Sequence, residues 1–84
     1  MDQTIIYRGR PFRLRNPGAQ TLLRRAVAKH DTGHRVAARR LVSLAVRIEA
    51  GLVTSAEAFD AADKVLRAAT TDQHILCRFL HASA

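Results

Sequence analysis

The residues of this chain best suited to chemistry are its arginines, and they are concentrated in one half of the sequence. Residues 1–47 hold eleven Lys or Arg against two acidic residues, a balance of +9, whereas residues 48–84 hold three against five, a balance of −2. The arginine guanidinium is planar and can donate two parallel hydrogen bonds to a phosphate or a carboxylate. This polarised charge favours docking of an acidic partner on one side of the molecule. A GC-rich genome, which raises arginine and alanine together, is the alternative source of the many arginines.

Histidine and cysteine could provide a second kind of chemistry, but their spacing matches no compact zinc signature. His74, Cys77 and His81 fall on one stripe of an expected helix. His30 and His34 lie four residues apart, but a helix break is expected between them. A zinc site needs four such ligands that converge in space. The sequence therefore predicts no metal site.

Patterns typical of catalysis are missing as well. The chain contains neither a Gly-rich phosphate loop nor a nucleophile elbow. Glu57 completes a helix capping box, and Asp60 and Asp63 each precede a basic residue by four positions. These three acidic residues therefore have structural roles. We expect a protein that is not an enzyme and that uses no cofactor.

Length and composition indicate one small domain over residues 1–84, with a basic hairpin at 1–16 and a helical body at 17–84. A hydrophobic content of 48% argues against disorder. The single cysteine, Cys77, excludes an internal disulfide and is typical of a reducing compartment. No stretch approaches the roughly 18 consecutive apolar residues of a membrane helix. We therefore expect no membrane span and a cytoplasmic location.

Two short segments near the N-terminus predict a β-hairpin. Residues 4–8 are β-branched and aromatic, residues 12–15 alternate in polarity, and a turn is expected at residues 9–10. In this pairing Phe12 and Leu14 face the body of the protein. The hairpin then folds back onto the helices. Alternatively, because isolated strands leave unpaired edges, it pairs with a second copy in a homodimer or with the sheet of a partner.

The rest of the chain predicts helices, with expected ranges of 17–30, 34–50, 55–69 and 72–82. Asn16 is the expected cap of the first helix, and Thr54 begins the capping box of the third. Thr70 or Thr71 is the expected cap of the fourth. The second helix is the most apolar and is expected at the centre. The predicted fold class is α+β, mostly α, with an N-terminal β-hairpin followed by a compact three- to four-helix bundle.

The predicted binding site combines the hairpin with the outer faces of the first two helices. Its cationic residues are Arg8, Arg10, Arg13, Arg15, Arg24, Arg25, Lys29, Arg39, Arg40 and Arg47. If they are adjacent, these side chains can neutralise several phosphates, and binding is then strongly salt-dependent. A helix-turn-helix is disfavoured because its recognition helix, residues 55–69, would present acidic residues to the phosphates. We therefore expect a bacterial or mobile-element accessory or regulatory factor that docks on the nucleic-acid backbone.

An acidic protein surface is the alternative partner for the same residues. A short Arg- and Ala-rich chain with one highly charged side also suits a phage- or mobile-element-encoded inhibitor. Such an inhibitor would dock on a host protein or nucleoprotein machine, for example a CRISPR surveillance complex, by protein–protein contacts. Both hypotheses use the same arginines, and they differ in whether the bound partner survives nuclease treatment.

Overall fold

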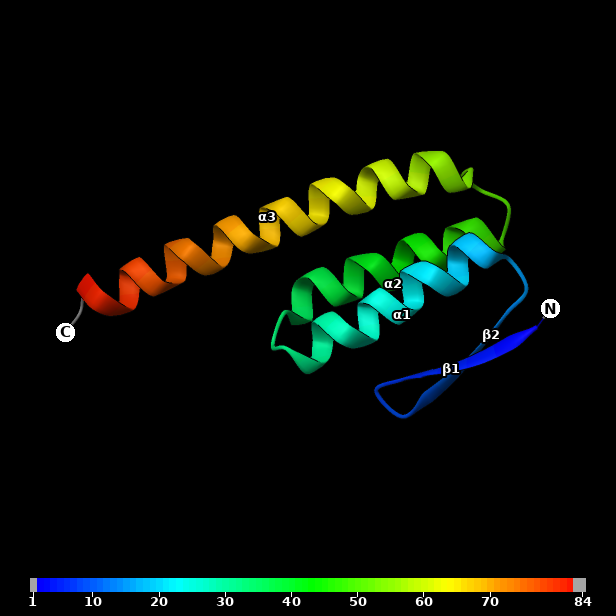
Figure 1. The fold of residues 1–84 in the computed structure, drawn as a ribbon, viewed down its shortest axis with the longest axis horizontal. Coiled ribbons are helices and arrows are strands. Elements are labelled where there is room, and N and C mark those ends of the chain that lie inside the picture. The colour runs from blue at the N-terminus through cyan, green and yellow to red at the C-terminus, as the bar shows by residue number, and fades with distance from the viewer. Residues whose placement is uncertain (1, 83–84) are drawn as a thin grey trace.

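Over residues 2–82 the protein consists of an N-terminal β-hairpin and three α-helices. The computed structural model describes the backbone of this range and the side chains of residues 2–68. The elements in chain order are β1 (Gln3–Tyr7), β2 (Arg10–Leu14), α1 (Pro17–Asp31), α2 (Arg35–Glu49) and α3 (Ser55–Ala82). The antiparallel pair of α1 and α2 lies in the middle, with the hairpin on one side and α3 on the other (Figure 1). The predicted fold class, α+β and mostly helical, is confirmed.

The hairpin closes through a two-residue turn at Arg8 and Gly9, one residue earlier than expected. Tyr7 pairs with Arg10, and the two turn residues have positive φ angles of 52° and 78°. Positive φ at both central positions is typical of a type I′ turn, whose twist suits the flanking strands. The expected turn at residues 9–10 and the strand bounds derived from it are therefore wrong. Arginine rarely adopts this conformation, so Arg8 gives no turn signal in the sequence.

The inner face of the hairpin packs against the helices. Leu14 is buried and Phe12 is half-buried, whereas Arg13 between them is exposed, as expected from the alternation. Tyr7 of β1 is only 7% exposed, and its ring lies edge-on against the His30 ring of α1 at 5.6 Å. Of the alternatives for the hairpin, the structure thus shows the one in which it folds back onto its own helices.

Local capping signals determine where two of the helices begin. Asn16 Oδ1 accepts hydrogen bonds from the N–H groups of Gly18 and Ala19, at 2.8 and 3.4 Å. Thr54 Oγ1 accepts a hydrogen bond from the N–H of Glu57 at 3.2 Å and donates one to its carboxylate at 3.0 Å. Both expected caps are confirmed, and α1 and α2 begin and end within one residue of their expected bounds.

One long helix, α3, replaces the two helices expected over 55–69 and 72–82. The expected cap at Thr70 or Thr71 is wrong. No glycine or proline interrupts this stretch, and a threonine caps a helix only where the backbone leaves the helical path. In Figure 1, α3 extends well past the pair of α1 and α2. The radius of gyration is accordingly 14.3 Å, against about 12 Å for a compact chain of this length.

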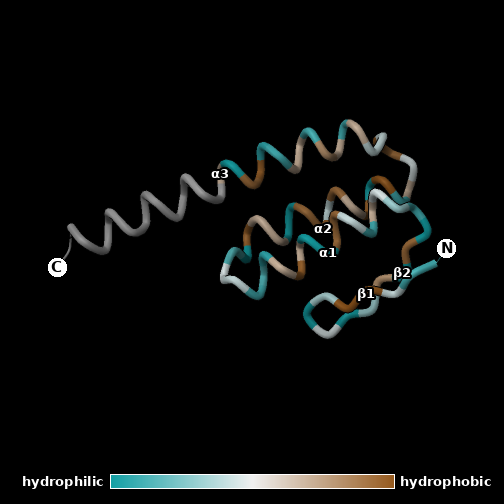
Figure 2. Tube along the Cα trace, viewed as in Figure 1, coloured by the Kyte–Doolittle hydropathy of each residue, from teal (hydrophilic) through white to brown (hydrophobic). Residues whose placement is uncertain are grey.

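The core between the helices is built from leucine and alanine. Leu22 and Leu23 of α1 and Leu41 of α2 are fully buried, and Ala58 and Ala62 bring α3 onto the same cluster. Hydrophobic and hydrophilic residues alternate along α1, α2 and residues 55–68 of α3 (Figure 2), so each of these segments buries one side and exposes the other. Small alanine side chains allow a close approach of the helices, but each of them buries little apolar area.

Replacement of Arg8 by asparagine should stabilise the fold. A left-handed conformation costs a non-glycine residue about 1–2 kcal/mol, and asparagine tolerates it better than arginine. Asparagine followed by glycine is also the preferred pair for a type I′ turn. We expect the free energy of unfolding to rise by roughly 0.5–1 kcal/mol in urea denaturation. The control Arg10→Asn places asparagine in β2 and should not raise the free energy of unfolding. Equal stability of Arg8→Asn and the wild type would contradict the turn assignment.

Candidate nucleic-acid interface

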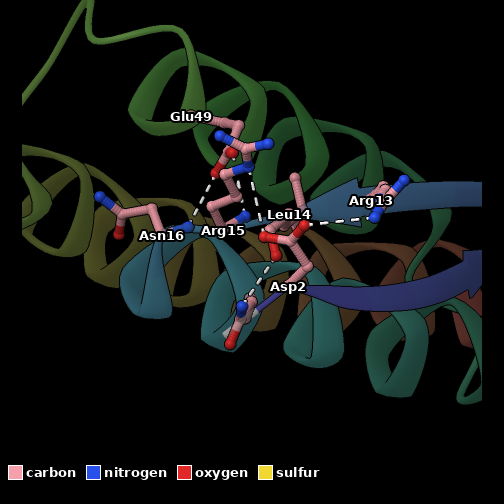
Figure 3. A network of polar contacts seen from close by, with 7 residues as sticks. Asp2, Arg13, Leu14, Arg15, Asn16 and Glu49 are labelled. Carbon is pink, nitrogen blue, oxygen red and sulfur yellow. Dashed lines mark hydrogen bonds and ion pairs between the residues drawn. The ribbon is translucent and has the colours of Figure 1, made fainter.

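Two arginines of the hairpin region share one carboxylate. Asp2 Oδ2 lies 3.3 Å from Arg13 Nη2, and Asp2 Oδ1 lies 3.3 Å from Arg15 Nε (Figure 3). Both arginine side chains are largely exposed, so these ion pairs contribute little to stability. Their effect is local, because the negative charge of Asp2 lowers the positive potential at the strand ends farthest from the turn.

A second carboxylate, that of Glu49, fastens the end of the hairpin to the end of α2. Its Oε1 and Oε2 accept hydrogen bonds from the backbone N–H groups of Arg15 and Asn16, both at 2.9 Å (Figure 3). The bond from Asn16, and next the bond from Arg15, lower the pKa of Glu49 below its ordinary value. Glu49 is the only acidic residue of α2. The arginines of α2 therefore have no other carboxylate on their own helix.

The cations of α1 are directed to different neighbours. Arg24 Nη2 donates a hydrogen bond to the side-chain oxygen of Gln3 on β1. The Arg25 guanidinium lies over the Phe59 ring of α3, 5.9 Å from its centroid. The hairpin and α3 flank the helix pair on opposite sides (Figure 1), so Arg24 contacts one flanking element and Arg25 contacts the other. Lys29 lies one turn after Arg25 and continues the side of α1 that faces α3.

The structure describes the side chains of residues 2–68. Within this range, six of the ten predicted binding residues have no intramolecular partner for their side chain. The side chains that make no hydrogen bond, ion pair or ring contact in this range are Arg8, Arg10, Lys29, Arg39, Arg40 and Arg47. Arg35 belongs to the same group, and the predicted site omitted it. Arg35 could have been predicted from the sequence, because it lies four residues before Arg39 and therefore on the same side of the helix.

Unpartnered arginines collect on the side of α2 that faces away from α1. Leu41 and Ala45 are buried in the core, and the exposed positions of α2 lie on the opposite side of the helix. We call the following set the α2–hairpin surface: Arg8 and Arg10 at the hairpin tip, with Arg35, Arg39, Arg40 and Arg47 on α2. Two valines interrupt the arginines of α2, Val36 at 65% and Val46 at 45% exposed.

A hollow joins the hairpin tip to α2. It has a volume of about 400 Å³ and is lined by Tyr7, Arg8, Arg10, Phe12 and Val42. Residues three or four positions apart are neighbours on a helix surface, so Val42 adjoins Arg39. Arg8 and Arg10 therefore line the hollow, and Arg39 is the arginine of α2 that adjoins it through Val42.

The structure does not bring all ten predicted residues onto one face. Because α1 and α2 pack through their buried sides, their exposed sides point in opposite directions. Arg24, Arg25 and Lys29 on α1 therefore lie apart from the α2–hairpin surface. Arg13 and Arg15 belong to the hairpin region but are paired with Asp2. The geometry thus reduces the candidate interface to the unpartnered arginines of two elements.

No protein-family model, curated protein or solved structure matches this chain. Within the described residues, no helix combines the length and the apolar character needed to cross a membrane. The same residues contain no group of three or more His, Cys, Asp or Glu side chains that could hold a metal ion. The stripe of His74, Cys77 and His81 lies outside the described side chains. A functional proposal therefore rests on the residues of the chain and their geometry.

Loss of the Glu49 charge should destabilise the protein in a pH-dependent way. A carboxylate whose pKa is lowered by folding contributes stability above its ordinary pKa, and this stability is lost as the pH falls through the folded value. We expect Glu49→Gln to lower the free energy of unfolding at pH 7 and to weaken the loss of stability below about pH 4.5. Urea denaturation across this range measures both effects. The control Asp31→Asn removes an equal charge from an exposed residue, and matching pH profiles for the two variants would contradict the role of Glu49.

Proposed function

We propose that the protein binds the backbone of nucleic acids through the α2–hairpin surface, without enzymatic activity. The observation that carries the proposal is a group of six exposed arginines whose side chains have no partner among residues 2–68. Unpaired guanidinium groups are suitable phosphate ligands, and their binding releases counterions from the nucleic acid. The small size of the chain suits an accessory or regulatory factor of a bacterium or mobile element, acting in the cytoplasm.

The length of the surface suits a polyanion with closely spaced charges. Arg35 and Arg47 are twelve residues apart, which corresponds to about 18 Å along the axis of α2. Double-stranded DNA carries one charge per about 1.7 Å, so about ten phosphates fall within this length. The phosphates within this length therefore outnumber the six arginines of the α2–hairpin surface.

Docking on the backbone, rather than recognition of a base sequence, is supported by the start of α3. Asp60 pairs with Lys64 at 3.5 Å, and Asp63 pairs with Arg67 at 2.9 Å, all on the exposed side of the helix. Glu57, also exposed, serves the capping box. A helix face whose cations are paired with its own carboxylates does not attract phosphates and offers few donors to base edges. This favours α2 and the hairpin tip over α3 as the contact elements.

An acidic protein surface is the second candidate partner, and the two exposed valines of α2 favour it. Val36 and Val46 lie among the arginines of the α2–hairpin surface. Protein interfaces are enriched in arginine and contain apolar residues at their centre, whereas phosphates gain nothing from valine. In this alternative the chain is an inhibitor that docks on a host protein or nucleoprotein machine. Val36→Ser with Val46→Ser would then weaken binding to a purified acidic partner but leave nucleic-acid binding unchanged.

Nucleic-acid binding should show a steep salt dependence that comes from the α2–hairpin surface. With six phosphate contacts, the logarithm of the binding constant should fall with the logarithm of the salt concentration at a slope of about −5 on a duplex. The double variant Arg39→Gln with Arg47→Gln should make this slope shallower by about two. Fluorescence anisotropy with a labelled duplex, at salt concentrations from about 50 to 200 mM, measures the slope.

A matched control separates a local site from the overall charge. Lys64→Gln with Arg67→Gln removes the same two charges from the exposed side of α3. This control should leave the slope close to that of the wild type. Equal slopes for the two double variants would assign binding to the net charge alone, and no binding at low salt would exclude the proposed function.

A further inference from the structure

The hollow between the hairpin tip and α2 contains more than backbone binding requires. Phosphate contacts need only cations, yet three of its five lining residues are Tyr7, Phe12 and Val42. A volume of about 400 Å³ lies within the range of sites that hold small organic groups. Its chemistry therefore combines an apolar and aromatic wall with a cationic rim formed by Arg8 and Arg10.

The two aromatic rings of the hollow have different roles. Tyr7 is almost fully buried, between the Phe12 ring at 6.4 Å and the His30 ring at 5.6 Å, both in edge-to-face geometry. Phe12 is only half-buried, so part of its ring remains available beside the hollow. Tyr7 thus contacts Phe12 edge-on from the buried side, and the exposed part of Phe12 borders the hollow.

The cationic rim includes a strained residue. Arg8 has a φ of 52°, in a region that a glycine or asparagine would occupy at lower cost. Its side chain is exposed and has no partner among residues 2–68, so no contact within that range compensates the strain. Strain of this kind is concentrated at functional sites. The turn therefore holds an arginine next to the hollow at a cost to stability.

We propose that this hollow holds one unstacked base of a single-stranded nucleic acid. The base would stack on Phe12, and Arg8 and Arg10 would bind the phosphates on either side of it. The inference rests on the proposed function and specifies its ligand. In a duplex the faces of the bases are covered by their neighbours, whereas a single strand offers them to aromatic side chains. An aromatic wall inside an arginine rim is therefore complementary to a single strand.

The test compares a single-stranded oligonucleotide of about 12 thymidines with a duplex of the same length, by fluorescence anisotropy at low salt. Phe12→Leu keeps an apolar side chain and removes the ring. It should weaken single-strand binding about tenfold and change duplex binding less than twofold. Arg13→Gln is the matched hairpin control, because Arg13 lies outside the hollow, and it should not change the ratio of the two affinities. Thermal unfolding of Phe12→Leu shows whether the variant is folded.

The wild-type protein provides a second readout that does not depend on any variant. Tyr7 is the only tyrosine, and the chain has no tryptophan, so intrinsic fluorescence reports on this hollow. After correction for absorbance, the single strand should quench this emission and the duplex should not. If both nucleic acids bind but neither Phe12→Leu nor the emission distinguishes them, the base site is wrong and the proposed function stands. If neither binds at low salt, both proposals are wrong.

Discussion

Glu49, at the end of α2, accepts two backbone hydrogen bonds from the residues that join the hairpin to α1. This contact brings three elements together at one point. Gln20 adds to it, because its side-chain amide donates a hydrogen bond to the Leu14 carbonyl at 2.8 Å. With its base held in this way, the hairpin lies along the helix pair, and residues around its turn line a hollow together with Val42 of α2. The hollow and the α2–hairpin surface both depend on this attachment.

The use of the few carboxylates determines which arginines remain available. Asp2 forms ion pairs with two arginines of the hairpin region, and Asp60 and Asp63 form ion pairs with cations of α3. Glu49 accepts hydrogen bonds from backbone N–H groups. The arginines of α2 and of the hairpin tip have no comparable partner among residues 2–68. The unpaired positive charge is thus found, in the folded chain, on the exposed residues of two elements, α2 and the hairpin tip. Which arginines form the candidate site therefore depends more on their local ion pairs than on the total charge of the chain.

Local sequence signals predicted much of this fold. Asn16 and Thr54 marked helix starts through capping, and the alternation around Phe12 and Leu14 marked the inner face of β2. The failures have physical causes. Arg8 adopts a backbone conformation that its residue type disfavours, which shifted the turn. The threonines at 70–71 resemble caps, but the backbone continues as a helix through them.

The candidate site was less predictable than the fold because it depends on contacts between distant residues. The attachment of Glu49 to Arg15 and Asn16 joins positions more than 30 residues apart. Neither it nor the placement of the hairpin tip and Val42 around one hollow has a signal in a single sequence. Residue types identified the arginines as binding groups, but only the fold separates those that are paired from those that are not.

If the proposed function is correct, the arginines without an intramolecular partner bind a polyanion and the paired ones do not. An NMR titration of the wild-type protein with a single-stranded oligonucleotide, following the arginine Nε–Hε signals, tests it directly. We expect the largest shifts at the six arginines of the α2–hairpin surface, and small shifts at Arg13, Arg15, Arg24 and Arg25. The largest shifts at these four arginines, or equal shifts at all ten, would contradict it.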